Sequence, residues 1–287
     1  MYNLTDVKEI KSILSRHGFN FSKSFGQNFL INPQIPQDIA IYSGINNDSG
    51  VIEIGPGMGT LTYELCKRAK KVVSVEIDKK LIPVLEDTMA DFSNFTLINK
   101  DILKTDLKKL IEEEFCDMDV YICANLPYYI TTPIIMKLLE EDLPIKSITV
   151  MVQKEVASRL CATEKDKDNG AISLAIRYYT TPKLLFDVAP DNFLPAPKVT
   201  SSVISLIPNE TKISCKDKDF MFRVIKAAFS QRRKTLLNSL SGASYLDISK
   251  EDIKKAMEIC GFSESVRGEK LSLSDFAKFS DVLLTEI

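Results

Sequence analysis

Short apolar runs alternate with amphipathic stretches over residues 51 to 208. The apolar runs have the length of strands, and the stretches between them have the length of helices. The strands are placed at 51–55, 71–76, 95–98, 119–124 and 146–152. This alternation predicts the α/β class, with a mostly parallel sheet covered by helices.

Two later runs are also rich in β-forming residues. They are AISLAIRYYTTPKLLFDVAP (171–190) and VTSSVISLIP (199–208), and turns containing proline separate them. We expect them to pair antiparallel at one edge of the sheet. After residue 208, apolar positions recur at helical spacing around 217–241, 249–260 and 273–286. The chain is therefore predicted to form an α/β domain over 1–208 and a small all-helical domain over 209–287.

The composition is that of an ordinary globular protein, with 287 residues, 45% hydrophobic and 26% charged. No apolar run reaches the roughly 18 to 20 residues of a membrane span, and the start lacks the layout of a signal peptide, so we expect a cytoplasmic protein. The six cysteines are scattered and His17 is the only histidine, so neither a metal site nor a disulfide framework is expected.

The net charge of −2 means that a nucleic-acid partner would need a local basic patch. Such a patch occurs between residues 220 and 246, which contain five basic residues and no acidic one. The basic residues are Arg223, Lys226, Arg232, Arg233 and Lys234, and the apolar stripe beside them is Phe222, Ile225, Phe229, Leu236 and Leu240. We interpret the cations as phosphate ligands for RNA; a solvated helix face is the alternative, and Arg267 is a weaker candidate.

A glycine-rich turn lies between a strand and a helix in VIEIGPGMGTLTYEL. Glycines there let the backbone approach a ligand closely, and the spacing Gly55, Gly57, Gly59 differs from that of dinucleotide binders. Glu53, just ahead of the turn, would repel a pyrophosphate but suits the ammonium group of S-adenosylmethionine.

Two more acids end the next two strands. Glu76 follows the glycine turn by about twenty residues, where a carboxylate accepts hydrogen bonds from the ribose of a nucleoside cofactor. Asp101, in LINKDIL, is placed to accept from an adenine amino group. The three acids and the glycines together predict a site for S-adenosylmethionine.

The tetrapeptide Asn125-Leu126-Pro127-Tyr128 follows a further strand, at the sheet edge where open α/β folds bind ligands. The exocyclic amine of adenine is a poor nucleophile, and acceptors such as the Asn125 oxygen and a nearby backbone carbonyl favour a pyramidal nitrogen. Pro127 fixes the backbone, and Tyr128 offers a stacking face for a flipped base. Phe193, in NFLPAPKV, would cover the other face of the base, although taken alone it reads as a core residue.

The chain resembles the KsgA-type ribosomal RNA adenine dimethyltransferases along nearly its whole length. The segments that carry the resemblance are KSFGQNFLIN, EIGPGMGTLT, VEID, NLPYYITTP, FLPAPKV and FSQRRKTLLNSL. It implies a class I S-adenosylmethionine-dependent methyltransferase fold, Rossmann-like with seven strands, acting on two adjacent adenosines near the 3′ end of small-subunit (16S) ribosomal RNA. By motif position it implies a cofactor site of Asn28, Leu30, Gly55, Glu76, Asp101 and Asn125, and a base pocket of Asn125, Tyr128 and Phe193.

Three other functions stay open on the sequence. The Erm-type large-subunit ribosomal RNA methyltransferases share the glycine loop and an N-x-P-Y motif, but NLPY, FLPAPKV and FSQRRK occur together here. DNA adenine methylation ranks low, because its motif more often carries a second proline or an acid. A role mainly in small-subunit assembly would use the basic patch beside an intact active site. We expect a monomer, with no membrane partner.

Overall fold

The computed structural model describes residues 2–19, 27–231 and 233–285. Contacts divide the chain into two units. Unit 1 comprises Met1–Ala157 and Lys183–Pro208, and unit 2 comprises Ser158–Pro182 and Asn209–Ile287. The last passage between the units follows Pro208, and residues 158–182 group with the C-terminal helices. The division of the chain into functional domains over 1–208 and 209–287 stays a prediction.

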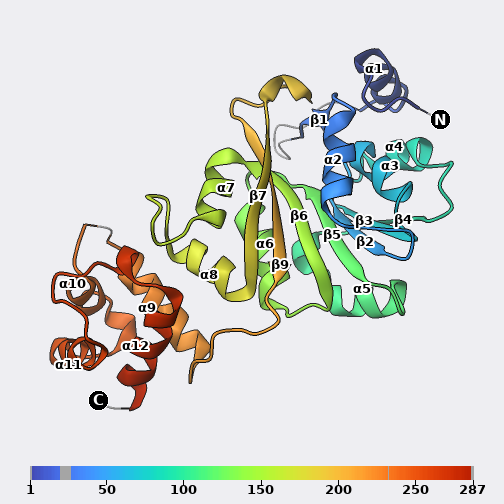
Figure 1. The fold of residues 1–287 in the computed structure, drawn as a ribbon. Helices are drawn as coiled ribbons and strands as arrows, with labels where there is room; N and C mark the ends of the chain where they lie inside the picture. The colour runs from blue at the N-terminus through green and yellow to red at the C-terminus, as the bar shows by residue number, and fades with distance from the viewer. Residues whose placement is uncertain (1, 20–26, 232, 286–287) are drawn as a thin grey trace. The chain divides into compact units, whose positions relative to one another are not determined.

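A seven-stranded sheet forms the centre of unit 1 (Figure 1). Its strand order is β4-β3-β2-β5-β6-β9-β7. In chain order the strands are β2 (Gly50–Ile54), β3 (Lys71–Glu76), β4 (Phe95–Asn99), β5 (Val120–Asn125), β6 (Ile145–Gln153), β7 (Thr180–Val188) and β9 (Ser201–Pro208). The first five pair in parallel, and β9 pairs antiparallel with β6. The predicted sheet is confirmed, with β7 and β9 at one edge.

The strand order reverses beside β2. From β2 the chain proceeds outward through β3 to β4, and then returns to place β5 on the other side of β2, with Glu53 opposite Cys123. Open α/β sheets bind ligands at the carboxyl ends of the strands that flank such a reversal. The glycine turn follows β2 and the tetrapeptide follows β5, so the topology brings the two motifs together.

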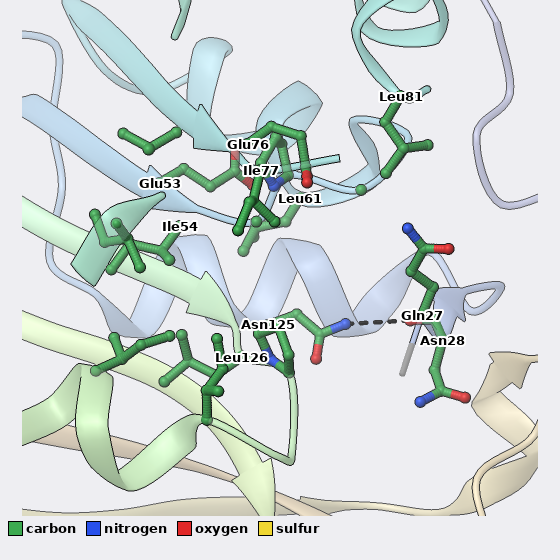
Figure 2. A pocket seen from close by; sticks show the side chains of 18 of the residues that line it. Gln27, Asn28, Glu53, Ile54, Leu61, Glu76, Ile77, Leu81, Asn125 and Leu126 are labelled. Carbon is green, nitrogen blue, oxygen red and sulfur yellow. Dashed lines mark hydrogen bonds between the residues drawn. The ribbon is translucent and has the colours of Figure 1, made fainter. Parts of the chain in front are cut away.

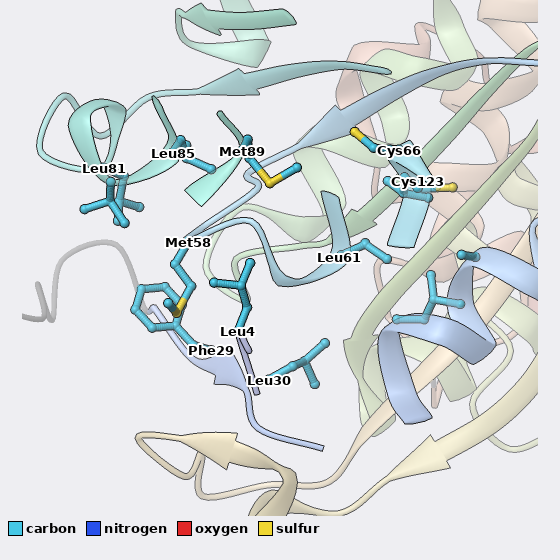
Figure 3. Close-up of a cluster of buried hydrophobic side chains, with 14 of the residues drawn as sticks. Leu4, Phe29, Leu30, Met58, Leu61, Cys66, Leu81, Leu85, Met89 and Cys123 are labelled. Atoms are coloured by element: carbon cyan, nitrogen blue, oxygen red, sulfur yellow. The ribbon is translucent and has the colours of Figure 1, made fainter. Parts of the chain in front are cut away.

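Helices flank this sheet (Figure 1). They are α2 (Gln34–Tyr42), α3 (Thr60–Cys66), α4 (Ile82–Thr88), α5 (Leu107–Glu114) and α6 (Thr131–Glu140). Helix α1 (Val7–Arg16) lies apart from the sheet, near α4, and α7 (Lys154–Cys161) begins in unit 1 and ends in unit 2. All five residues of β2 are buried, as expected for a strand covered on both faces. One cluster of buried side chains joins Leu4, Phe29, Met58, Leu85 and Met89 (Figure 3). It packs against the glycine turn, because Met58 is part of that turn and Phe29 lies next to Gly57.

The prediction of a strand over AISLAIRYY is wrong, because these residues form helix α8 (Ala171–Tyr179). Its apolar side chains also fit a helical period, since Leu174, Ala175 and Tyr178 are all buried. The Ser173 hydroxyl accepts from the Gly170 N–H at 3.1 Å and so satisfies a backbone donor at the start of the helix. Only the second half of this run continues as a strand.

Unit 2 contains α8 and four C-terminal helices. These are α9 (Lys218–Phe229), α10 (Leu236–Ser241), α11 (Lys250–Cys260) and α12 (Leu273–Thr285). The helix expected over 217–241 is therefore two helices. The break has a local cause, because Ser230 ends α9 and the Thr235 hydroxyl caps α10 by accepting from the Asn238 N–H at 3.4 Å. None of the helices in the described part of the chain is long and apolar enough to cross a membrane.

Candidate active site

One pocket lies at the carboxyl ends of β2, β3, β4 and β5, and four sequence motifs meet in it (Figure 2). All eight residues predicted to bind the cofactor line this pocket, as do two of the three other residues predicted at the reaction centre. They are Asn28, Leu30, Glu53, Gly55, Gly57, Glu76, Asp101 and Asn125, with Pro127 and Tyr128. Residues separated by a hundred positions in the chain thus share a single site.

The glycine turn has backbone torsions that residues with a side chain rarely adopt. Gly55, Gly57 and Gly59 have φ of 68°, 65° and 95°, in the left-handed region that favours glycine. A Cβ on Gly57 would lie 3.2 Å from the ring of Phe29, so the turn also packs closely against the segment that contains Asn28 and Leu30. Gly59 begins α3 as its N-terminal cap residue. Gly55 and Gly57 line the pocket without a side chain, whereas a Cβ on Gly59 would lie 2.9 Å from the sulfur of the buried Met89.

Glu53 lies beneath the glycine turn, with only 1% of its surface exposed. One carboxylate oxygen accepts from the Thr62 hydroxyl at 2.7 Å and from the Ser74 hydroxyl at 2.6 Å. Burial raises the pKa of this carboxyl to about 7, against the opposing effect of the two hydroxyl donors. The site thus contains an acid that a cationic ligand would favour in its charged form.

Glu76 ends β3, and its carboxylate accepts from the Asp78 N–H at 2.8 Å. Burial raises its pKa to about 7 as well. Asp78 in turn accepts from the Gln27 side-chain amide at 2.8 Å. This chain of bonds joins the segment before Asn28 to the end of β3, and it holds the two walls of the pocket together.

Asp101 follows β4, where it caps the short 3-10 helix η2 (Ile102–Lys104). Its Oδ1 accepts from the Leu103 N–H at 2.9 Å. The capping bond fixes the carboxylate at the pocket wall, and the other oxygen can accept from a ligand. This is the position at which the sequence predicts recognition of an adenine amino group.

The tetrapeptide after β5 is held by several bonds. The Asn125 side-chain N–H donates to the Asn28 carbonyl at 3.3 Å, so the carboxamide oxygen faces the pocket as an acceptor (Figure 2). The Pro127 carbonyl already accepts from the Ile130 N–H at 3.3 Å and the Thr131 hydroxyl at 3.0 Å. The Tyr128 hydroxyl lies 2.6 Å from the Ser201 hydroxyl. Burial raises the pKa of Tyr128 above its ordinary value.

Phe193 is not among the described residues that line the pocket. It is 3% exposed, belongs to the buried cluster, and pairs through the short strand β8 (Phe193–Leu194) with Leu30 on β1 (Phe29–Leu30). The Asn32 and Asn192 side chains also bond at 2.8 Å beside this pair. The segment therefore braces the residues around Asn28, and contact of Phe193 with a base stays a prediction.

The basic residues predicted to bind RNA lie in unit 2. Arg223 and Lys226 are exposed on α9, whereas Arg233 and Lys234 are exposed in the connection to α10. The four cations are expected on one helix face from the sequence, but they do not lie on one helix. Arg232 lies outside the described residues. In the predicted apolar stripe Ile225, Leu236 and Leu240 are buried, while Phe222 and Phe229 are half-buried. Arg267 is exposed.

Several residues that line the pocket lie outside the set predicted from the sequence. They are Gln27, Ile54, Ile77, Leu81, Ile102 and Tyr129. Ile77 and Tyr129 are 44% and 54% exposed although they are large and apolar or aromatic. Ile77 directly follows Glu76 at the end of β3, and Tyr129 directly follows Tyr128 in the turn after β5. That adjacency is the sequence signal that would have found them.

The chain is similar to known proteins along most of its length. The family model described as "Ribosomal RNA adenine dimethylase" matches residues 18–274. "Ribosomal RNA small subunit methyltransferase A" of Lachnoclostridium phytofermentans is 46% identical, over 99% of this chain and 98% of its own length. A solved dimethyladenosine transferase from Plasmodium falciparum is 27% identical with a TM-score of 0.69, and the match covers 87% of this chain and 95% of that chain.

The fold is also shared more widely. The solved 23S rRNA methyltransferase ErmE has a TM-score of 0.67 at 21% identity, covering 90% of this chain and 100% of that chain, and this shows a common fold alone. The predicted methyltransferase fold, with its seven-stranded sheet and helical C-terminal part, is confirmed. The chain is an enzyme of the methyltransferase class and belongs to the ribosomal RNA adenine dimethylase family.

Proposed function

We propose that this protein transfers methyl groups from S-adenosylmethionine to the N6 amines of two adjacent adenosines near the 3′ end of small-subunit (16S) ribosomal RNA. The product would be N6,N6-dimethyladenosine. The observation that carries the proposal is the single pocket in which the glycine turn, Glu76, Asp101 and the Asn125–Tyr128 segment meet. The name of the 46% identical relative, a small-subunit methyltransferase, supports the choice of substrate.

The donor set of the pocket fits S-adenosylmethionine. Glu53 and Glu76 are buried carboxyls with raised pKa values, and a ligand with positive charge would offset the cost of ionising them. Glu76 suits the ribose hydroxyls and Asp101 the adenine amine, while Ile77 and Ile102 offer apolar walls. When bound, the molecule supplies an activated methyl group on a sulfonium.

The residues of the tetrapeptide act on the target amine. The Asn125 oxygen accepts one N–H of the adenine N6, because its own amide nitrogen is occupied by Asn28. The Pro127 carbonyl already has two donors, so we assign the second acceptor to the Leu126 carbonyl. Two acceptors favour a pyramidal nitrogen whose lone pair can attack in line. Positioning and hydrogen bonding then provide the main catalytic contribution, and no strong base is required.

The target adenosine must leave its stack to reach this pocket. Tyr128 lines the pocket and offers a ring face on which the base can stack. The exposed cations of unit 2, Arg223, Lys226, Arg233 and Lys234, would contact phosphates of the ribosomal RNA. We infer that the substrate is the small ribosomal subunit or its precursor, which the name of the 46% identical relative supports, and that the enzyme acts as a monomer in the cytoplasm.

Asn125→Ala tests the chemistry assigned to this site. The substitution removes the carboxamide oxygen assigned to the N6 amine, together with the Nδ2 donor to the Asn28 carbonyl. We expect methyl transfer to small subunits to fall by about 100-fold or more, as when one preorganised contact is lost from other transition-state sites. Binding of S-adenosylhomocysteine, measured by calorimetry, separates this loss from loss of the cofactor. Transfer at the wild-type rate would contradict the assigned role.

A further inference from the structure

The hydroxyl of Ser201 touches the predicted stacking residue from a distant part of the chain. Ser201 begins β9, has no exposed surface, and lies 2.6 Å from the Tyr128 hydroxyl. It pairs with Gln153 at the end of β6, and β6 in turn pairs with β5, which leads into the tetrapeptide. The serine therefore reaches Tyr128 across two strands of the sheet. A buried hydroxyl needs a partner, and each of these two groups supplies the other's.

The bond fixes the far end of the tyrosine ring. A tyrosine side chain rotates about two torsions, and a hydrogen bond at its hydroxyl restricts the first, which swings the whole ring. The phenol oxygen lies on the axis of the second torsion, so the bond restrains that rotation only through its preference for the plane of the ring. A tyrosine keeps its proton at neutral pH, and burial raises the pKa of Tyr128 further, so the bond between the two hydroxyls persists. The ring is thus held at the pocket wall before any base arrives. Such preorganisation reduces the entropy lost when a ligand binds.

We propose that Ser201 is a positioning residue for adenosine methylation, which holds the Tyr128 ring so that the flipped base meets a stacking face already in place. The inference rests on the proposed function, because it assumes that Tyr128 stacks on the target base. It assigns a role to Ser201, two residues after the segment FLPAPKV, for which the sequence predicts none.

The next residue on β9 is a matched control. Successive side chains of a strand point to opposite faces, and the Ser202 hydroxyl bonds instead to Asp187 at 2.7 Å. Asp187 also pairs with Lys154 at 2.6 Å. Ser202 is as fully buried as Ser201, but its hydrogen bond does not reach the pocket. A loss of packing alone would affect Ser201→Ala and Ser202→Ala alike.

The experiment compares methyl transfer by Ser201→Ala, Tyr128→Phe, their double variant and Ser202→Ala. The substrate is purified small ribosomal subunits that lack adenine dimethylation, at varied concentrations. We expect kcat/KM for subunits to fall by about two- to tenfold in each of the first two variants, the range of one lost hydrogen bond. The double variant should be no worse than the poorer single one, because both remove the same bond. Affinity for S-adenosylhomocysteine and the kcat/KM of Ser202→Ala should stay at wild-type values.

Two results would overturn the inference while the wild-type enzyme is active. One is an equal loss of kcat/KM in Ser201→Ala and Ser202→Ala, which would indicate packing. The other is a double variant whose loss is the product of the two single losses, which would indicate independent roles. A wild-type chain that transfers no methyl group to the subunits would overturn the proposed function itself and the inference with it. Thermal unfolding of each variant confirms that the folded protein is compared.

Discussion

At the residue scale, the site is defined by two buried carboxyls that have the same unusual pKa. Glu53 and Glu76 each have a pKa raised to about 7 by burial, compared with 4.5 for an ordinary glutamate. Raised carboxyl pKa values are frequent where a protein binds a cationic ligand. The free-energy cost of ionising a buried carboxyl is offset only when the positive charge of the ligand lies beside it. The unliganded pocket is therefore sensitive to pH in the neutral range.

This shift predicts a pH dependence of cofactor binding. If the ionised form of Glu53 binds the cation, the affinity for S-adenosylmethionine should fall by about tenfold between pH 8 and pH 6, as the carboxyl takes up a proton. The change Glu53→Gln should lower the affinity at pH 8 and reduce the slope. Calorimetric titrations at the two pH values measure both effects. Equal affinities of the wild-type protein at pH 6 and pH 8 would contradict the assignment.

The same carboxyls affect the stability of the unliganded protein in the opposite direction. Their folded-state pKa of about 7 exceeds the value of 4.5 in an unfolded chain. Protonation therefore favours the fold, and this contribution is complete below about pH 4.5 and is lost as the pH rises through 7. We expect the stabilisation by added S-adenosylhomocysteine to be larger at pH 8 than at pH 6. Thermal unfolding with and without it tests this, and a larger effect at pH 6 would be the contrary result.

At the element scale, the glycine turn and the short β1–β8 ladder hold the cofactor side of the pocket. Gly57→Ala would place a methyl group in the left-handed region, which costs about 1 to 2 kcal/mol, and 3.2 Å from the Phe29 ring. Gly18→Ala is the control, since its φ is 61° and nothing lies within 4 Å of the added Cβ. Both should lower the free energy of unfolding, with the larger loss in Gly57→Ala, and only Gly57→Ala should weaken cofactor binding. Similar binding by the two variants would refute a close-packed turn.

The N-terminal helix packs into the buried cluster through Ile10, Ile13 and Leu14, and one carboxylate bonds to the residues at its ends. Asp87, at the end of α4, bonds to the Tyr2 hydroxyl at 2.9 Å and to His17 at 2.8 Å, and it pairs with Arg16 at 3.2 Å. Asp87→Asn should weaken these bonds, lower the free energy of unfolding by about 1 to 2 kcal/mol and speed amide exchange in α1. The neighbouring Glu86 is exposed, so Glu86→Gln is the control. Unchanged exchange in Asp87→Asn would show that apolar packing alone holds the helix.

The elements predicted correctly from the sequence are those in which the spacing of apolar residues fits only one kind of secondary structure. The five parallel strands are buried apolar runs of fixed length, and each lies within a residue or two of its prediction. The errors have local causes. The run 171–179 is so apolar that it fits the spacing of a strand as well as that of a helix. The break after α9 depends on the capping hydroxyls of Ser230 and Thr235, which the spacing of apolar residues does not reveal. The contact between Tyr128 and Ser201 depends on strand order, which no local pattern encodes.

At the scale of the whole molecule, the chain combines an acidic overall charge with exposed cations in unit 2. Removing one phosphate contact, as in Arg223→Gln or Lys226→Gln, should weaken RNA binding and reduce the slope of log Kd against log salt by about 1. Lys70→Gln is the control, because Lys70 is exposed just before β3, at the end of that strand away from the pocket. Salt titrations of binding to small subunits measure the slopes. Equal slopes in all three variants would exclude α9 from the RNA interface.

The central claim is the identity of the modified nucleoside and of the subunit that contains it. The direct measurement is methyl transfer from labelled S-adenosylmethionine to purified small and large ribosomal subunits that lack adenine dimethylation. The product nucleosides are then identified by mass spectrometry. The proposed function predicts N6,N6-dimethyladenosine in the RNA of the small subunit alone. Incorporation only into large-subunit RNA, or into neither subunit, would contradict it.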